Sequence, residues 1–153
     1  MFTLQRTADI FCMGIKHEIE NDYYLSTMRG LVSADIFTDY LDMAEHLLTD
    51  HYYIPAAVIV GSTLEEHLRK LCQKNNLLLS FTDAKGKLHF KTGSDFNIDL
   101  YKAEVYNKIE MGLVESWQKI RNDAAHGNYD QFNEQQVNYM LQGVKEFIGR
   151  NLL

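Results

Sequence analysis

Apolar residues recur every three or four positions along most of this chain, and that spacing marks one face of an α-helix. The stripe is clearest in the second predicted helix, where Ala34, Phe37, Leu41, Ala44 and Leu48 share a face. The pattern predicts helices at residues 3–20, 23–48, 55–74, 98–106 and 109–126, and a last helix with Val137, Met140, Leu141, Val144, Phe147 and Ile148 inward that ends near Arg150.

Residues with special backbone preferences mark where these helices begin and end. Proline is tolerated in the first turn of a helix, and glycine is common just after the last turn. Residues whose side chains can accept hydrogen bonds from the first backbone N–H groups mark the start of a helix. The markers are Pro55 at one start, Asn75-Asn76 at its end, Gly127 after the fifth helix and Asn133-Glu134-Gln135-Gln136, with capping-box spacing, before the last. Gly61 would let a neighbouring helix approach closely.

Residues 77–91 break the helical pattern. Leu79, Phe81 and Phe90 flank the turn-like sequence Asp83-Ala84-Lys85-Gly86, which predicts a short hairpin followed by a loop at 92–97. The fold class is therefore predicted to be all-α, an antiparallel bundle of four to five long helices with a hairpin and short-helix insertion. The 153 residues suit a single domain, with 1–30 as an N-terminal helical arm.

The net charge of −6 argues against a general nucleic-acid coat protein, whose affinity would come from neutralising phosphates. Acidic residues dominate positions 1–55 and basic residues dominate 56–92, so surfaces of opposite sign are expected. No apolar run approaches the roughly 18 residues of a membrane span, and residues 1–13 lack a signal-peptide layout. With isolated cysteines, Cys12 and Cys72, expected to be reduced and buried, the cytoplasm is the predicted compartment.

Spacings typical of several chemistries are missing from the sequence. There is no CxxC, HExxH or paired His/Cys spacing for zinc. There is also no phosphate-cradling glycine loop and no Gly-x-Ser-x-Gly elbow. Neither a metal site nor a cofactor is therefore predicted, and the histidines other than His126 are interpreted as surface or structural residues.

Candidate chemistry gathers at the end of the fifth predicted helix. Arg121, Asn122 and His126 offer a guanidinium, an amide and an imidazole just before Gly127. In a continuous helix Asn122 and His126 are four apart and share a face, with Arg121 about 100° away. The three side chains could converge on one anion. A separate apolar stripe would pack the helix against the core, and it consists of Leu113, Trp117, Ile120 and Ala124.

The same spacing fits a structural role. Arg121 could pair with Asp123 or Glu65 at the edge of the core. His126 could be a favourable cation at a helix C-terminus. Spacing leaves both interpretations open.

A longer similarity favours the functional interpretation. Arg121-Asn122-x-x-x-His126 resembles the Arg-x4-6-His signature of the HEPN superfamily (higher eukaryotes and prokaryotes nucleotide-binding domains). Residues 120–127, Ile-Arg-Asn-Asp-Ala-Ala-His-Gly, resemble the Arg-Asn-x-Ala-Ala-His-Gly block of bacterial members. Residues 56–69 look like their helix of small residues, Gly, Leu-Glu and Leu-Arg, and with Asn97-x-x-Leu100 the resemblance spans roughly 31–150.

The resemblance implies a helical homodimer in which two motif copies meet at a cleft. Active members are metal-independent endoribonucleases of toxin–antitoxin, abortive-infection and CRISPR-associated systems. RNA or a nucleotide, and an antitoxin or larger effector partner, are therefore implied partners, with no membrane. By the same resemblance His126 is general base or acid, Arg121 stabilises the phosphorane charge, and Asn122 positions the phosphate or the imidazole. Cleavage would leave a 2′,3′-cyclic phosphate and a 5′-hydroxyl.

Other residues near the motif receive secondary roles. Members paired with a nucleotidyltransferase antitoxin carry a modifiable tyrosine two residues after the histidine, where this chain has Asn128. The remaining assignments are phosphate contacts at Arg69 and Lys119, a helix acid at Glu65 that orients Arg121 or closes the bundle, and supporting residues at Trp117 and Tyr129.

Two other functions stay open. One is a non-catalytic HEPN module for dimerisation or for binding RNA or a nucleotide, as a piece of a larger protein. The other is a helical protein–protein adaptor whose acidic second helix, with Asp35 and Asp39, docks a basic partner.

Overall fold

The computed structural model describes residues 35–153 of the chain. The predicted helix at 3–20, the start of the helix at 23–48 and the proposed arm at 1–30 lie outside the described residues. Residues Thr38–Leu153 form one compact unit, and the fold is described for that unit.

The described residues are mostly helical, with one small two-stranded sheet, so the predicted all-α class is confirmed. A helical segment at 35–49 comes first. The elements that follow are α2 (Tyr53–Lys74), β1 (Ser80–Thr82), β2 (Leu88–Phe90), α3 (Gly93–Lys102), α4 (Lys108–Ala125), the 3-10 helix η1 (Tyr129–Gln131) and α5 (Glu134–Arg150). Within residues 35–153 each helix is too short or too polar to cross a bilayer.

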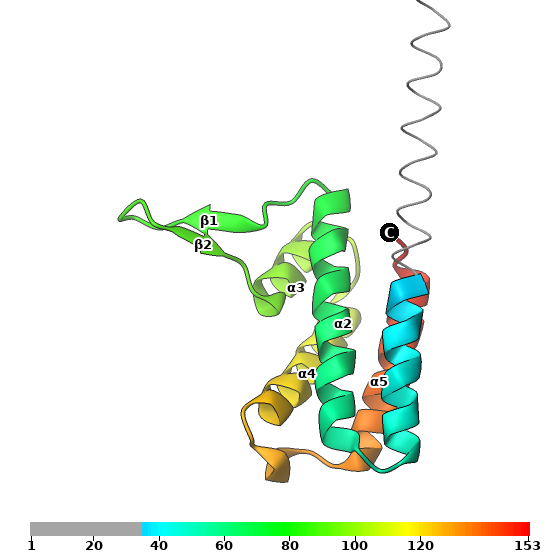
Figure 1. Cartoon of the computed structure of the whole chain (residues 1–153). Helices are drawn as coiled ribbons and strands as arrows, with labels where there is room; N and C mark the ends of the chain where they lie inside the picture. The colour runs from blue at the N-terminus through cyan, green and yellow to red at the C-terminus, as the bar shows by residue number, and fades with distance from the viewer. Residues whose placement is uncertain (1–34) are drawn as a thin grey trace, which may run out of the picture. The chain divides into compact units, whose positions relative to one another are not determined.

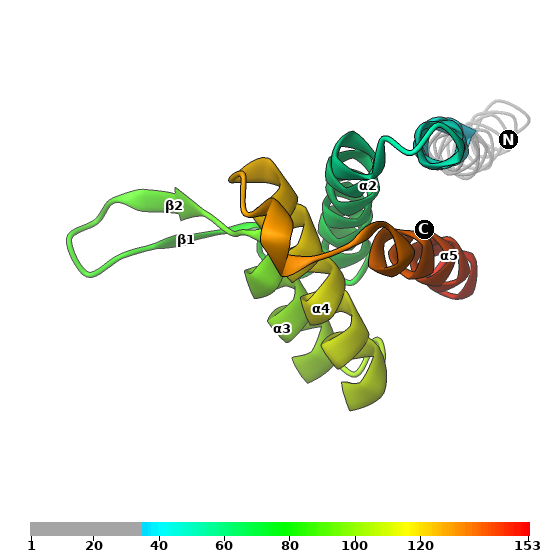
Figure 2. The same cartoon turned by 90° about the horizontal axis from the view of Figure 1, so that it is seen from below.

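Helix α2 occupies the centre of the bundle and packs against α3, α4 and α5 (Figures 1 and 2). Its predicted inner face is confirmed, because Ala57, Gly61, Leu64, Leu68 and Leu71 are all buried. Burial of one leucine side chain contributes roughly 1.5–3 kcal/mol to folding, so this stripe is a main source of stability.

The predicted ends of the helices are largely confirmed. Helix α2 begins at Tyr53, two residues before Pro55, and Asn75 caps its end. Gly127 follows α4 with φ +82°, a left-handed conformation that glycine adopts without strain. Asn133 and Gln136 form the predicted capping box of α5, since each side chain accepts a hydrogen bond from the other residue's backbone N–H.

The predicted position of the short helix is wrong. Helix α3 begins at Gly93 instead of Ile98 and ends at Lys102, so most of the predicted loop at 92–97 is helical. The cause is a second capping box: the Thr92 side chain accepts a hydrogen bond from Asp95 N, and the Asp95 side chain accepts one from Thr92 N. Helix α3 thus starts earlier than predicted, and its first residue, Gly93, lies against Gln118 of α4.

The predicted apolar face of α4 needs one correction. Leu113 is 42 % exposed, whereas the neighbouring Val114 is fully buried. Gln118 is buried as well, at 8 % exposed. Helix α4 packs against both α2 and α3, so its buried face is wider than the single stripe that the apolar residues predict.

Three glycines on three different helices receive side chains from α4. A Cβ atom added at any of these positions would lie within 2.5 Å of the facing side chain. The pairs are Gly61 of α2 with Arg121, Gly93 of α3 with Gln118, and Gly143 of α5 with Trp117. The close approach predicted for Gly61 is thereby confirmed.

Buried polar and sulfur groups tie the bundle together. Cys72 is buried with a free thiol, as predicted, and burial raises its pKa to about 11. Cys12 lies outside the described residues. The imidazole of His67, which is buried in α2, lies 2.7 Å from the backbone oxygen of Asn151 and so fixes the C-terminal end of α5.

We expect His67 to make folding sensitive to acid. Burial lowers its pKa from 6.5 to about 4, so the folded state holds this ring neutral where the unfolded chain would bind a proton. The contribution to the free energy of unfolding is complete above about pH 6.5. As the pH falls toward about 4, roughly 3 kcal/mol should be lost.

Urea titrations between pH 7 and pH 4 check this expectation. A His67→Gln variant keeps a donor for the Asn151 carbonyl but does not titrate, so its loss of stability should be smaller by that amount. Parallel curves for the two proteins would contradict the assignment.

The predicted hairpin is confirmed. Strands β1 and β2 pair in antiparallel fashion with Phe81 opposite His89, and Gly86 in the turn has φ +80°. The turn is held by Asp83, whose carboxylate accepts the backbone N–H groups of Lys85 and Lys87. The hairpin extends away from the helices (Figures 1 and 2).

Candidate functional site

Arg121 lies where α4 passes closest to α2. Because Gly61 has no side chain, the Cβ and Cγ atoms of Arg121 rest directly on the backbone of α2. An added Cβ at position 61 would lie 2.3 and 2.2 Å from those two atoms. The close contact with Gly61 therefore fixes the Cβ and Cγ atoms of Arg121, while the guanidinium of Arg121 reaches a partly open surface.

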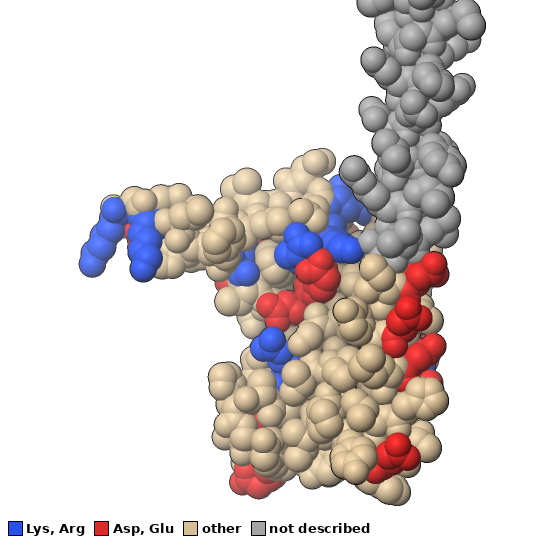
Figure 3. All heavy atoms as spheres, viewed as in Figure 1, with Lys and Arg blue, Asp and Glu red and all other residues tan. Residues whose placement is uncertain are grey.

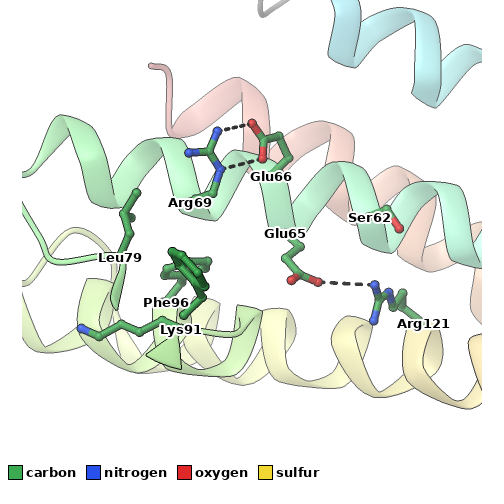
Figure 4. Close-up of a pocket in the computed structure, with 9 residues that line it drawn as sticks. Ser62, Glu65, Glu66, Arg69, Leu79, Lys91, Phe96 and Arg121 are labelled. Carbon is green, nitrogen blue, oxygen red and sulfur yellow. Dashed lines mark hydrogen bonds and ion pairs between the residues drawn. The ribbon is translucent and has the colours of Figure 1, made fainter. Parts of the chain in front are cut away.

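The guanidinium is held on two sides. Its Nη1 donates a hydrogen bond of 3.0 Å to Asn122 Oδ1, and its Nη2 lies 3.6 Å from Glu65 Oε2 (Figure 4). Among the residues that the structure describes, Nε is buried without a hydrogen-bond partner. The predicted pairing with Glu65 is confirmed, and the alternative pairing with Asp123 is wrong because Asp123 binds Lys119 at 2.6 Å.

Arg121 and Glu65 border two adjoining cavities. The larger, of about 470 Å³, is shown in Figure 4 and lies between α2, α3 and the hairpin. Its other lining residues are Ser62, Glu66, Arg69, Leu79, Phe90, Lys91 and Phe96. The smaller, of about 260 Å³, is completed by Gly61, Thr92, Gly93, Ser94, Gln118 and Asn122.

The other cations of the larger cavity already have carboxylate partners. Arg69, a predicted phosphate contact, lines the cavity but donates two hydrogen bonds to Glu66. That bond lowers the pKa of Glu66, so the carboxylate stays ionised. Lys91 contacts Asp99 at 2.6 Å. Arg69 can therefore hold a phosphate only by sharing or leaving Glu66.

Lys119, the other predicted phosphate contact, lines neither cavity; it is exposed and paired with Asp123, whose pKa the hydrogen bond from Lys119 lowers. Glu66, the carboxylate partner of Arg69, is half-buried and lines the larger cavity. Neighbouring residues on a helix point about 100° apart. Lys119 therefore points away from the contact between α4 and α2.

Asn122 and His126 occupy the exposed end of α4. His126 is the C-cap residue, and its backbone N–H donates to the Asn122 carbonyl at 3.0 Å. The imidazole lies close enough to Asp123 to interact with its carboxylate. Within the described part of the chain the ring of His126 makes no hydrogen bond, and it lines neither cavity.

One chain thus brings Arg121, Asn122 and Glu65 together, while His126 is exposed at the end of α4. Trp117 supports the site from the core, packed edge-on against Phe147. Tyr129 lies in η1 and is exposed. The geometry can hold an anion at the guanidinium, and the imidazole lies outside both cavities at the end of the same helix.

Several lining residues were not predicted from the sequence. Gln118 and the first turn of α3 border the smaller cavity, and Leu79, Phe90 and Lys91 of the hairpin border the larger. The sequence did contain a signal for the first group, because Thr92-Gly93-Ser94-Asp95 has the spacing of a helix start. The hairpin residues follow from how the chain folds back, which no local spacing shows.

Gln118 carries an energetic cost that a substitution should reveal. Within residues 35–153, its Nε2 group is buried against Gly93 without a hydrogen-bond acceptor. Such a group costs about 1–3 kcal/mol, so Gln118→Met, of similar length, should raise the free energy of unfolding by about 1 kcal/mol. Chemical denaturation measures this, and a fall in stability would show that the amide has a partner.

Comparison of the chain with protein-family models, with curated proteins and with solved structures finds no match. Arg121, Asn122 and His126 are therefore interpreted from their positions in the structure and from the chemistry of their side chains.

Proposed function

We propose that this protein is a metal-independent endoribonuclease that acts as a homodimer through Arg121, Asn122 and His126. The observation that carries the proposal is the placement of Arg121. Its guanidinium is fixed over Gly61 at the edge of two cavities and is bonded to Asn122, and the side chain is 31 % exposed. A planar guanidinium at the edge of an open cavity suits a phosphodiester.

The chemistry assigned to each group conserves atoms and charge. His126 removes the proton of a ribose 2′-hydroxyl, and the resulting oxygen attacks the adjacent phosphorus. Arg121 stabilises the charge that grows on the non-bridging oxygens, and Asn122 positions the phosphate or the imidazole. The bond from phosphorus to the 5′-oxygen breaks, and that oxygen takes a proton. The products are a 2′,3′-cyclic phosphate and a 5′-hydroxyl.

A second copy of the chain supplies the acid in this proposal. Each chain contributes one motif histidine, which as a neutral base cannot also protonate the leaving oxygen in the same step. Two chains that meet at the exposed ends of α4 would provide both a base and an acid. His126 and Tyr129 are exposed there, which leaves room for such contact.

The proposed setting is a toxin or antiviral defence system in the cytoplasm. A ribonuclease with broad activity needs a control, so we include an antitoxin or larger effector partner in the proposal. The exposure of His126 supports the inclusion of such a partner. A partner bound over this surface would block access to the imidazole.

A non-catalytic RNA-binding or nucleotide-binding module is the second candidate. The observation that favours it is the position of His126, which lines neither of the two cavities that Arg121 borders. One chain then offers a guanidinium to a phosphate without a general base in the same cavity. For the adaptor alternative, Lys145 of α5 pairs with Asp42 and Glu45 of the acidic helix, whereas Asp35 and Asp39 are exposed.

RNA cleavage in the presence of a chelator tests the proposal. Purified protein should cut single-stranded RNA with excess EDTA present, and the products should carry 2′,3′-cyclic phosphate ends. Binding without cleavage would favour the module. Neither binding nor cleavage across diverse RNAs would overturn both candidates.

A further inference from the structure

One face of the hairpin forms a continuous strip from its tip to the larger cavity. Side chains alternate between the faces of a strand, so cross-strand partners share a face. Phe81 pairs with His89, Lys91 N donates to Leu79 O, and Asp83 N donates to Lys87 O. The three pairs on this face are therefore Leu79 with Lys91, Phe81 with His89, and Asp83 with Lys87.

The middle pair is a flat, partly exposed platform. The rings of Phe81 and His89 are stacked with centroids 5.3 Å apart and planes 18° apart. His89 Nε2 lies 2.8 Å from Asp83 Oδ2, which fixes the orientation of the imidazole. Phe81 is 49 % exposed, so one face of its ring is open to a further flat group.

The tip of the hairpin is basic in a chain that is acidic overall. Lys85 and Lys87 are exposed, and neither ammonium group has a hydrogen-bond or ion-pair partner in the described part of the chain. Figure 3 shows basic side chains at the end of the hairpin, away from the acidic groups of the helices. Between residues 77 and 92 the only opposing carboxylate in the sequence is Asp83.

The inner end of the strip opens into the candidate site. Leu79 and Lys91 both line the cavity that Arg121 borders, as Figure 4 shows. Exposed lysines, an open aromatic ring and a cavity with a guanidinium thus follow one another along a single face. Phosphates attract the lysines, and unpaired bases stack on aromatic rings.

We propose that this face binds single-stranded RNA, with one base stacked on Phe81 and backbone phosphates at Lys85 and Lys87. The bound strand leads past Leu79 and Lys91 to Arg121. The inference rests on the proposed function, and it adds the substrate class, an unpaired strand, and the residues that hold it outside the catalytic motif. A duplex does not fit, because its bases are not free to stack on a side chain.

Fluorescence anisotropy tests the inference with the full chain carrying His126→Ala, so that the RNA stays intact. The probe is a labelled single-stranded RNA of about 12 nucleotides. Phe81→Ala should weaken binding about tenfold, and Phe81→Trp should preserve it. Lys87→Gln should weaken binding about threefold and lower the slope of log affinity against log salt by about 0.7.

Leu88→Ala is the matched control, because Leu88 is an exposed apolar residue of the same hairpin on the opposite face. It should change affinity by less than about twofold, since no base stacks on it. Equal losses for Phe81→Ala and Leu88→Ala would overturn the inference, as would an unlabelled duplex that competes as well as a single strand. A fall in dimer mass with either variant would assign the hairpin to contact between chains and would also overturn it.

The two proposals can fail separately. Hairpin-dependent binding by a wild-type chain that leaves RNA uncut supports the RNA-binding face and refutes the ribonuclease. Cleavage with unchanged kcat/KM in Phe81→Ala and Lys87→Gln refutes the RNA-binding face and leaves the ribonuclease standing.

Discussion

Replacing His126 with alanine should lower the rate of RNA cleavage by at least about 100-fold, because a positioned general base contributes roughly 100- to 10,000-fold. The variant should fold normally, since His126 is exposed and its ring makes no hydrogen bond within residues 35–153. Single-turnover assays with a labelled RNA measure the chemical step. Anisotropy on the same protein should show RNA affinity within about threefold of wild type, because the imidazole acts on the proton and not on the phosphate charge.

His46→Ala is the matched control for this experiment. His46 is also an exposed histidine, on the helical segment at 35–49, and lines neither cavity. Its replacement should leave both rate and affinity unchanged. Arg121→Ala should reduce the rate and weaken binding together, since a guanidinium attracts the phosphate in the ground state as well as in the transition state. If His126→Ala cuts as fast as wild type, His126 is not the base.

Gly61→Ala should destabilise the fold by about 3 kcal/mol, at the upper end of the usual cost of overpacking. The added methyl group would lie 2.2 Å from Arg121 Cγ and 2.3 Å from its Cβ. A change of rotamer can move Cγ, but Cβ is fixed to the backbone of α4. The two helices must therefore separate, and Arg121 must leave its place at the cavity.

Gly112→Ala offers the matched control, because Gly112 is also inside a helix but has nothing within 4 Å of an added Cβ. Alanine there should raise stability by about 1 kcal/mol through helix propensity alone. Thermal or urea unfolding gives both values, and RNA cleavage should fall only in Gly61→Ala. Equal stability of the two variants would contradict the close packing of α2 on α4.

Local sequence signals predicted the parts of the fold that depend on a few neighbouring residues. The glycine after His126, the capping box at Asn133 and the turn at Gly86 each use the conformation that their residue types favour. The inner face of α2 was also predictable, since an apolar stripe has to be buried. The motif in the fifth predicted helix and the pattern of the third predicted that Arg121, Asn122 and Glu65 would lie together. The contact between Arg121 and Glu65 confirms the predicted pairing of these two residues.

The parts that the sequence did not predict depend on contacts between distant segments. Gln118 is polar and was not expected to be buried, yet the missing side chain at Gly93 leaves space for it. Leu113 is apolar and was expected inside, but α4 is rotated so that Val114 takes the inner position. The contribution of the hairpin to the cavity arises only after the chain has folded back.

The three glycines that face α4 also bear on the kinetics of any reaction at its end. The contacts seat α4 against three separate helices, because Gly61, Gly93 and Gly143 lie on α2, α3 and α5. They position the Cβ and Cγ atoms of Arg121 before a ligand arrives, so less binding energy is consumed in aligning the guanidinium. A larger residue at position 61, 93 or 143 should accordingly be tolerated only when the facing residue, Arg121, Gln118 or Trp117, is made smaller.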